Sequence, residues 1–137
     1  MDVDRSQIPP LGADRPFTAL RVQTATLSNG LSVLVAERRD LPKVTVTLVT
    51  RAGSVRDTSG QSGLAHLTAQ VMARGSATRD ALAVDAALGE LGASFAIQVQ
   101  QESARVGVDV LGRHLPEALA VLADVVQQPT FPAAEVD

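Results

Sequence analysis

The dipeptide Asn29-Gly30 constrains the fold most strongly, because it separates two short runs of strand-forming residues, 21–28 and 31–36. Asn and Gly both tolerate positive φ angles, which a type I′ turn requires at its two central positions. We therefore expect a β-hairpin with a type I′ turn here. The second run is apolar at nearly every position, which is typical of a strand covered on both faces.

Three later segments also have the pattern of strands. Residues 43–50 place Val44, Val46 and Leu48 on one face, and the alternation in β-branched residues predicts a strand. Residues 94–100 and 103–110 alternate in the same way and are separated by only two residues. They are therefore expected to form two antiparallel strands.

Three segments have the apolar spacing of helices. Ser62 is expected to cap a helix that runs to about Arg74, with Gly75 at its C-terminal end. The apolar stripe of this helix is expected to consist of Leu64, Leu67, Val71 and Met72. The other two helices are predicted from about residue 78 to Gly92 and over residues 115–127.

The order of these elements predicts an α+β fold, an antiparallel sheet with helices packed on one face. Residues 1–20 contain three prolines and no periodicity, so we expect an extended linker or arm there. Residues 21–137 are expected to form the N-terminal part of a longer domain, because residues 131–137 resemble the first turn of a further helix.

The composition argues against several classes of protein. The net charge is −3 and the only aromatic residues are three Phe, so the chain offers neither a basic field nor stacking surfaces for nucleic acid. The absence of Cys removes disulfides, thiolate nucleophiles and Cys-ligated zinc. No apolar run approaches the roughly 20 residues of a membrane span, and no apolar core of a signal peptide is present near the start.

His66 is the most interesting candidate for chemistry. It lies on the first predicted helix, outside the apolar stripe, and its neighbours one turn later are Ala69 and Gln70. A helical zinc site places its ligands and general base at this spacing. One imidazole does not hold zinc tightly, a carboxamide is a poor ligand and Ala69 supplies no base. These residues by themselves favour a polar helix face over a metal site.

The remaining candidates are weaker. His114 is expected in a solvated loop before the last helix. Asp80, Asp85 and Glu90 are too loosely spaced for a paired-carboxylate site and are interpreted as solvated. The glycines of residues 59–63 lack the preceding strand and following Lys of a phosphate-binding loop.

The order of elements and several local sequences together resemble the pitrilysin/insulinase family, which includes the mitochondrial processing peptidases. The resemblance covers about residues 21–137. The segments that carry it are residues 26–35, 51–54, 62–66, 72–78, 91–93 and 122–131.

The resemblance implies the fold of that family and a zinc site at the predicted first helix. In active members the helix carries His-x-x-Glu-His, in which the two His bind zinc and the Glu activates water. These three positions fall on His66, Ala69 and Gln70, so two of the three groups are missing. The third ligand, a Glu, would lie beyond Asp137. The resemblance therefore implies a non-catalytic member, with no catalytic, cofactor-binding or metal-binding residue in this chain.

Such members work with an active half or subunit that carries the intact motif and the zinc, and the two halves enclose a chamber for extended peptide substrates. The arm of residues 1–20 resembles the connector of tandem bacterial versions, which implies a periplasmic or exported protein. Two alternatives remain: a structural subunit related to the core proteins of the bc1 complex, and an active zinc metalloendopeptidase with a degenerate motif that uses His66 and ligands outside this chain.

Overall fold

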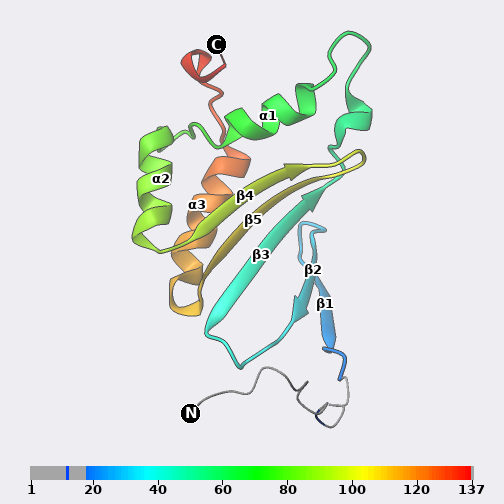
Figure 1. Ribbon diagram of the computed structural model, residues 1–137, viewed down its shortest axis with the longest axis vertical. Helices are drawn as coiled ribbons and strands as arrows, with labels where there is room; N and C mark the ends of the chain where they lie inside the picture. The colour runs from blue at the N-terminus through cyan, green and yellow to red at the C-terminus, as the bar shows by residue number, and fades with distance from the viewer. Residues whose placement is uncertain (1–11, 13–17, 137) are drawn as a thin grey trace, which may run out of the picture. The chain divides into compact units, whose positions relative to one another are not determined.

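The computed structural model in Figure 1 describes residue 12 and residues 18–136. The chain divides into two compact units, Met1–Asp40 and Leu41–Asp137, and each is described by itself. Apart from residues 12 and 18–20, the arm predicted for residues 1–20 lies outside the described residues.

The first unit contains the predicted hairpin. Strand β1 (Val22–Thr26) pairs antiparallel with β2 (Ser32–Ala36). The expectation that β2 is covered on both faces is wrong for this structure, since Val33 is its only half-buried residue and Leu34 is 69% exposed.

The turn of this hairpin differs from the predicted type I′. Leu27 N–H donates to the Leu31 carbonyl, and Gly30 N–H donates to the Leu27 carbonyl, which gives a three-residue loop. Only Gly30 has a positive φ angle, of 86°. Asn29 stabilises the turn through its side chain instead, because its Oδ1 accepts a hydrogen bond from Leu31 N–H at 3.0 Å.

The second unit is built on an antiparallel sheet of three strands in the order β3-β5-β4. Their bounds are Lys43–Thr50 for β3, Ser94–Val99 for β4 and Ala104–Leu111 for β5. The long β5 lies in the middle and pairs with β3 on one side and with β4 on the other. Its alternate valines are buried on one face of the sheet. The strands predicted from period-two alternation are all present.

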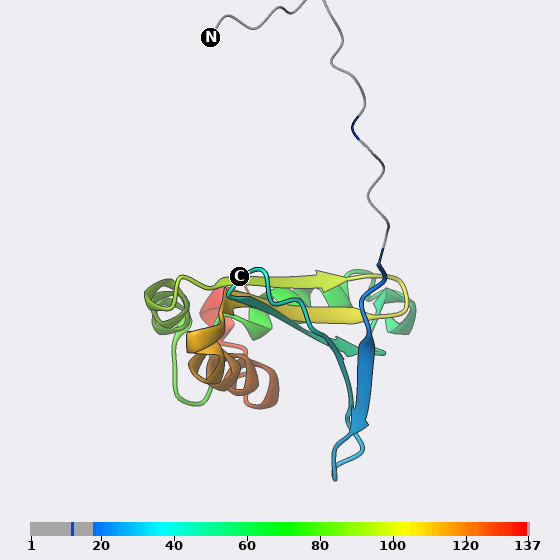
Figure 2. The same ribbon diagram turned by 90° about the horizontal axis from the view of Figure 1, so that it is seen from below.

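Three helices complete this unit: α1 (Leu64–Met72), α2 (Ala81–Glu90) and α3 (Leu115–Gln127). Figure 2 shows α3 packed across one face of the sheet. Three short 3-10 helices cover Ser54–Arg56, Gly112–His114 and Ala133–Glu135. The structure thus confirms the α+β fold with helices on one face of an antiparallel sheet. None of the helices within the described residues is long and apolar enough to cross a membrane.

The core is aliphatic and lies between α2, α3 and the sheet. It consists of Val84, Leu88, Val106, Val108, Val110, Ala118, Val121, Leu122 and Val125. Burying one Val or Leu side chain contributes about 1.5–3 kcal/mol to the hydrophobic term, so this set fixes α3 against β5.

A polar cluster joins the α1–α2 connection to α3. The Oδ2 atom of Asp124 accepts hydrogen bonds from the hydroxyls of Ser76 and Thr78, each at 2.6 Å, and from Arg79 at 2.7 Å. The hydrogen bonds from Ser76 and Thr78 are the main reason that the pKa of Asp124 lies below its ordinary value, with a further contribution from Arg79. The cluster therefore holds the start of α2 and the end of α3 together.

The ends of α1 and α2 differ in part from the prediction. The helix α2 begins later than expected, because Asp80 is its N-cap and accepts a hydrogen bond from Ala83 N–H at 2.8 Å. Gly75 is not a left-handed C-terminal residue of α1, which ends at Met72. A Cβ atom at Gly75 would instead lie 2.8 Å from the Thr130 hydroxyl, so this glycine permits a close approach of two segments.

Candidate functional site

The helix α1 begins differently from the prediction. Ser62 is not its N-cap; that position belongs to Gly63, with a φ angle of 94° and no capping side chain. The carboxylate of Asp57 takes over this role and accepts hydrogen bonds from Gly63 N–H at 2.9 Å and Ala65 N–H at 3.0 Å. Asp57 lies six residues before Gly63, outside the usual spacing of a capping residue, so no local pattern could have indicated it.

The segment before α1 is attached to the turn between β4 and β5. Ser54 N–H donates to the Gln100 carbonyl at 3.0 Å, and Val55 N–H donates to the Gln101 carbonyl at 2.8 Å. Gly53 allows this approach, because a Cβ atom there would lie 2.3 Å from the Gln101 carbonyl oxygen. These contacts and the Asp57 cap position the start of α1 relative to strand β4.

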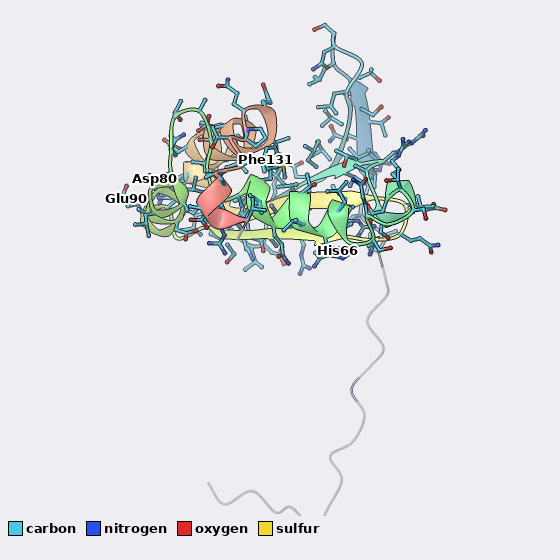
Figure 3. All side chains as sticks on the ribbon, turned by 90° about the horizontal axis from the view of Figure 1, so that it is seen from above. His66, Asp80, Glu90 and Phe131 are labelled. Carbon is cyan, nitrogen blue, oxygen red and sulfur yellow. The ribbon has the colours of Figure 1, made fainter. Side chains whose placement is uncertain are left out.

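The two polar positions of the motif lie on an exposed part of α1. His66 and Gln70 are both exposed, and Figure 3 shows where His66 lies on the helix. Ala69, between them, is only 7% exposed. The predicted apolar stripe is wrong in part, since Leu64 and Leu67 are 45% and 44% exposed while Val71 is buried.

These residues do not form the donor set that a zinc peptidase requires. The imidazole of His66 is a usual zinc ligand, but the carboxamide of Gln70 is not, and the buried methyl group of Ala69 supplies no general base. Within the described part of the chain, no three His, Asp or Glu side chains gather closely enough to hold a metal ion.

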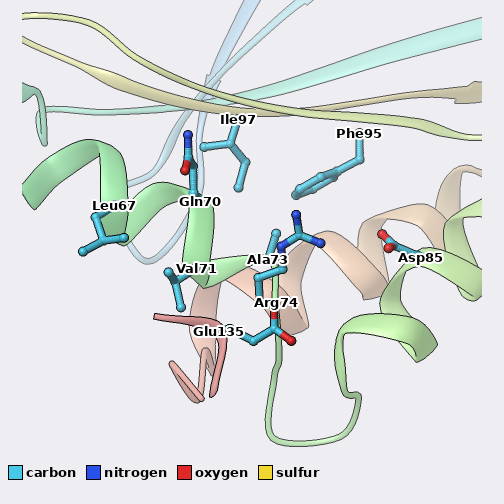
Figure 4. A pocket seen from close by; sticks show the side chains of 9 residues that line it. All are labelled: Leu67, Gln70, Val71, Ala73, Arg74, Asp85, Phe95, Ile97 and Glu135. Atoms are coloured by element: carbon cyan, nitrogen blue, oxygen red, sulfur yellow. The ribbon is translucent and has the colours of Figure 1, made fainter. Parts of the chain in front are cut away.

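A groove of about 780 Å³ lies between α1 and the helix-covered face of β4 (Figure 4). The side chains that line it come from α1 and the two residues after it, from β4, from α2 and from the last 3-10 helix. They are Leu67, Gln70, Val71, Ala73, Arg74, Asp85, Phe95, Ile97 and Glu135. The groove brings Gln70, one of the motif positions, together with the edge strand of the sheet.

Charged side chains border this groove in a way that the sequence did not reveal. Arg74 lies two residues after α1, Asp85 lies on α2 and Glu135 lies on the last 3-10 helix. Figure 4 shows the Arg74 guanidinium near Phe95. Among the described residues, none of the three charged groups forms an ion pair with another within 4 Å. Residues this far apart in sequence carry no shared local pattern.

The outer edge of β4 is not paired with any strand among the described residues. Gln100 N–H donates to the Ser103 carbonyl at 2.8 Å, so these two residues form a hydrogen-bonded pair. Bonded and non-bonded pairs alternate along an antiparallel ladder. The backbone N–H and C=O groups of Phe95, Ile97 and Val99 therefore point away from β5, toward the open edge.

The other candidates from the sequence lie apart from this groove, except Asp85. His114 is half-buried at the end of a 3-10 helix, and its Nε2 accepts a hydrogen bond from Arg113 at 3.0 Å. Asp80 caps α2, and Glu90 is the last, exposed residue of that helix (Figure 3). The structure does not bring these side chains together with His66 into one cluster of possible metal ligands.

Similar proteins of known sequence include peptidases. An "uncharacterized zinc protease" of Rickettsia felis is 29% identical over 110 residues, which cover 80% of this chain and 27% of that protein. The mitochondrial-processing peptidase subunit beta of Mus musculus is 30% identical over 115 residues, 84% of this chain and 23% of that subunit. The chain thus spans about a quarter of the length of these relatives.

Solved structures of similar fold agree with this result. The peptidase M16 inactive domain from Pseudomonas fluorescens superimposes with a TM-score of 0.78 at 34% identity, over 84% of this chain and 28% of that one. A protease from Helicobacter pylori shares the fold, with a TM-score of 0.78 at 19% identity over 85% of this chain and 28% of that one. The sequence profile described as "Insulinase (Peptidase family M16)" matches residues 32–137. The chain belongs to this insulinase family of peptidases, M16.

Proposed function

We propose that this chain is a non-catalytic unit of an M16 peptidase, which holds an extended peptide for an active partner that carries the zinc. The observation that carries the proposal is the helix α1, where the three motif positions hold His66, Ala69 and Gln70. Without a general base and with one usual ligand, this helix is not equipped to activate water. The family's zinc site is, on this proposal, lost from this chain.

The open edge of β4 supports a role in binding peptides. Phe95, Ile97 and Val99 present unpaired backbone donors and acceptors along about 14 Å of strand, at roughly 3.4 Å per residue. A peptide that adds a strand to a sheet edge gains main-chain hydrogen bonds at every second residue, largely independent of its sequence. This mode suits a unit that must hold varied substrates.

The proposed partner is a second M16 half or subunit with an intact motif. Relatives of this chain include proteins named as the alpha and as the beta subunit of mitochondrial-processing peptidase. The close likeness to a domain described as inactive, at 34% identity, supports the assignment of the non-catalytic role to this chain. Zinc and water activation would then reside in the partner, and this unit would contribute one wall of the chamber.

Peptide binding tests the proposal. An array of overlapping twelve-residue casein peptides, incubated with the intact protein, selects a binding sequence, which is then synthesised with an N-methyl group at each position in turn. Strand addition at one edge predicts that methylation at alternate positions weakens binding about tenfold or more, while methylation at the positions between them has a smaller effect.

A proline variant checks that β4 is the strand involved. Val99→Pro removes an N–H that points away from β5, so it spares the ladder of the sheet while it removes a donor at the edge. Val99→Ala keeps that N–H and serves as the matched control. Loss of binding in the first variant alone supports the proposal. Absence of binding to every casein peptide, or no alternation in the effect of methylation, would contradict it and favour a structural subunit.

A further inference from the structure

We infer that Gln70 is a peptide-anchoring residue, whose carboxamide binds the backbone of a substrate held at the edge of β4. This inference rests on the proposed function and adds a residue to it. In active members of the family this position holds the second His of the zinc-binding motif, and here we assign Gln70 a role in peptide binding. The ligand is a backbone amide of an extended peptide.

The position of Gln70 carries the argument. The side chain is exposed, lines the groove beside Ile97, and comes from α1, the helix that contacts the edge strand β4. Figure 4 shows its carboxamide directed toward β4, near the Ile97 side chain. Within the described residues, the Gln70 carboxamide has no hydrogen-bond partner in the protein. Its donor and acceptor are therefore available to a ligand.

The chemistry of the carboxamide matches what a peptide strand leaves unsatisfied. A strand paired with β4 uses every second N–H and C=O for that pairing, and the groups between them face outward. A carboxamide has two donor hydrogens and an acceptor oxygen, so one Gln can bind an outward C=O and an adjacent N–H. The carboxamide is uncharged and does not activate water, so this contact holds the peptide without promoting its cleavage.

The test compares Gln70→Ala with Gln127→Ala in the intact protein, using the casein peptide that the array selects and fluorescence anisotropy as the readout. Both residues are exposed and helical, and Ala favours a helix at least as well as Gln, so neither variant is expected to unfold. The loss of one or two neutral hydrogen bonds predicts about three- to tenfold weaker binding for Gln70→Ala. Gln127→Ala is expected to bind as the unmodified protein does.

A double-mutant cycle with the methylated peptides locates the contact. N-methylation at one outward-facing position should remove the difference between Gln70→Ala and the unmodified protein, while methylation elsewhere should leave it. If the alternating pattern of methylation persists but Gln70→Ala binds with unchanged affinity, this inference is overturned and the proposed function stands. If no casein peptide binds the unmodified protein, the proposed function fails, and the anchoring role fails with it.

Discussion

Removing the carboxylate of Asp57 should destabilise α1, the helix that carries the motif positions. The carboxylate accepts hydrogen bonds from Gly63 N–H and Ala65 N–H, at 2.9 and 3.0 Å. Losing a capping side chain costs about 0.5–2 kcal/mol, and losing a negative charge at a helix N-terminus costs about 0.3–1 kcal/mol. We therefore expect Asp57→Ala to lower the free energy of unfolding by about 1–3 kcal/mol.

Urea unfolding of the purified protein measures this loss as a shift of the midpoint with an unchanged slope. Asp57→Asn keeps an acceptor oxygen without the charge, so its loss should be smaller. Hydrogen exchange provides a local readout, because amides in the first turns of α1 should exchange faster in Asp57→Ala while those of α3 change less.

The matched control is Ser62→Ala, which removes the side chain that the sequence pattern favours as the cap. Ser62 does not cap the helix in the structure, so this substitution should change the free energy of unfolding by less than about 0.5 kcal/mol. An equal or larger loss in Ser62→Ala than in Asp57→Ala would refute the assignment of the cap.

Three further predictions concern the motif helix and the residues that position it. Gly53→Ala should destabilise the protein by about 1–3 kcal/mol in urea unfolding, because the added Cβ would lie 2.3 Å from a backbone oxygen. Gly89→Ala, in α2 with open space around it, should stabilise the protein by about 0.5–1 kcal/mol. A more stable Gly53→Ala than Gly89→Ala would contradict the close approach at Gly53. The pKa of Asp124 is lowered in the folded state by Ser76 and Thr78, so its contribution to stability is present above the ordinary pKa near 3.8 and is lost as the pH falls through the lower, folded value. The stability of Asp124→Asn should accordingly fall less steeply as the pH is lowered than that of the unmodified protein. The same fall of stability with pH in both proteins would contradict this role of Asp124. Gln70→His should create a pair of imidazoles one helical turn apart, so added zinc should raise the unfolding temperature of this variant and not that of the unmodified protein.

The strands could be predicted well because their signal is local. Lys43–Thr50 alternates strictly, and its bounds agree with β3 as predicted. The last helix, Leu115–Gln127, also agrees, because its apolar face and its Pro in the first turn lie within one segment. In both cases the periodicity of the side chains matches that of the element, and tertiary contacts do not override it.

The beginning of α1 could not be predicted, because its cap comes from a distant loop. Ser62 has the right chemistry at the right place in the sequence, yet the carboxylate of Asp57 reaches the same N–H groups. The prediction of a type I′ turn at Asn29-Gly30 was wrong for a related reason. The side chain of Asn29 accepts a hydrogen bond from a backbone N–H, and only Gly30 needs a positive φ angle. The local sequence alone does not distinguish between the two possible caps or between the two turn types.

The motif positions could be located from the sequence, but their surroundings could not. His66, Ala69 and Gln70 followed from the resemblance, whereas the burial of Ala69 and the groove beside β4 depend on how α1 packs against the sheet. Arg74, just after α1, and Asp85, on α2, lie at one groove only because of the tertiary packing. Such juxtapositions depend on tertiary structure and leave no trace in local spacing.

The zinc content of the intact protein tests the central claim most directly. Metal analysis compares the unmodified protein with His66→Ala, and Gln70→His serves as the variant with a second imidazole. We expect His66→Ala to hold the same amount of zinc as the unmodified protein, because α1 lacks the donors of a zinc site. Stoichiometric zinc that is lost upon His66→Ala would contradict the account and make this chain part of an active metallopeptidase centre.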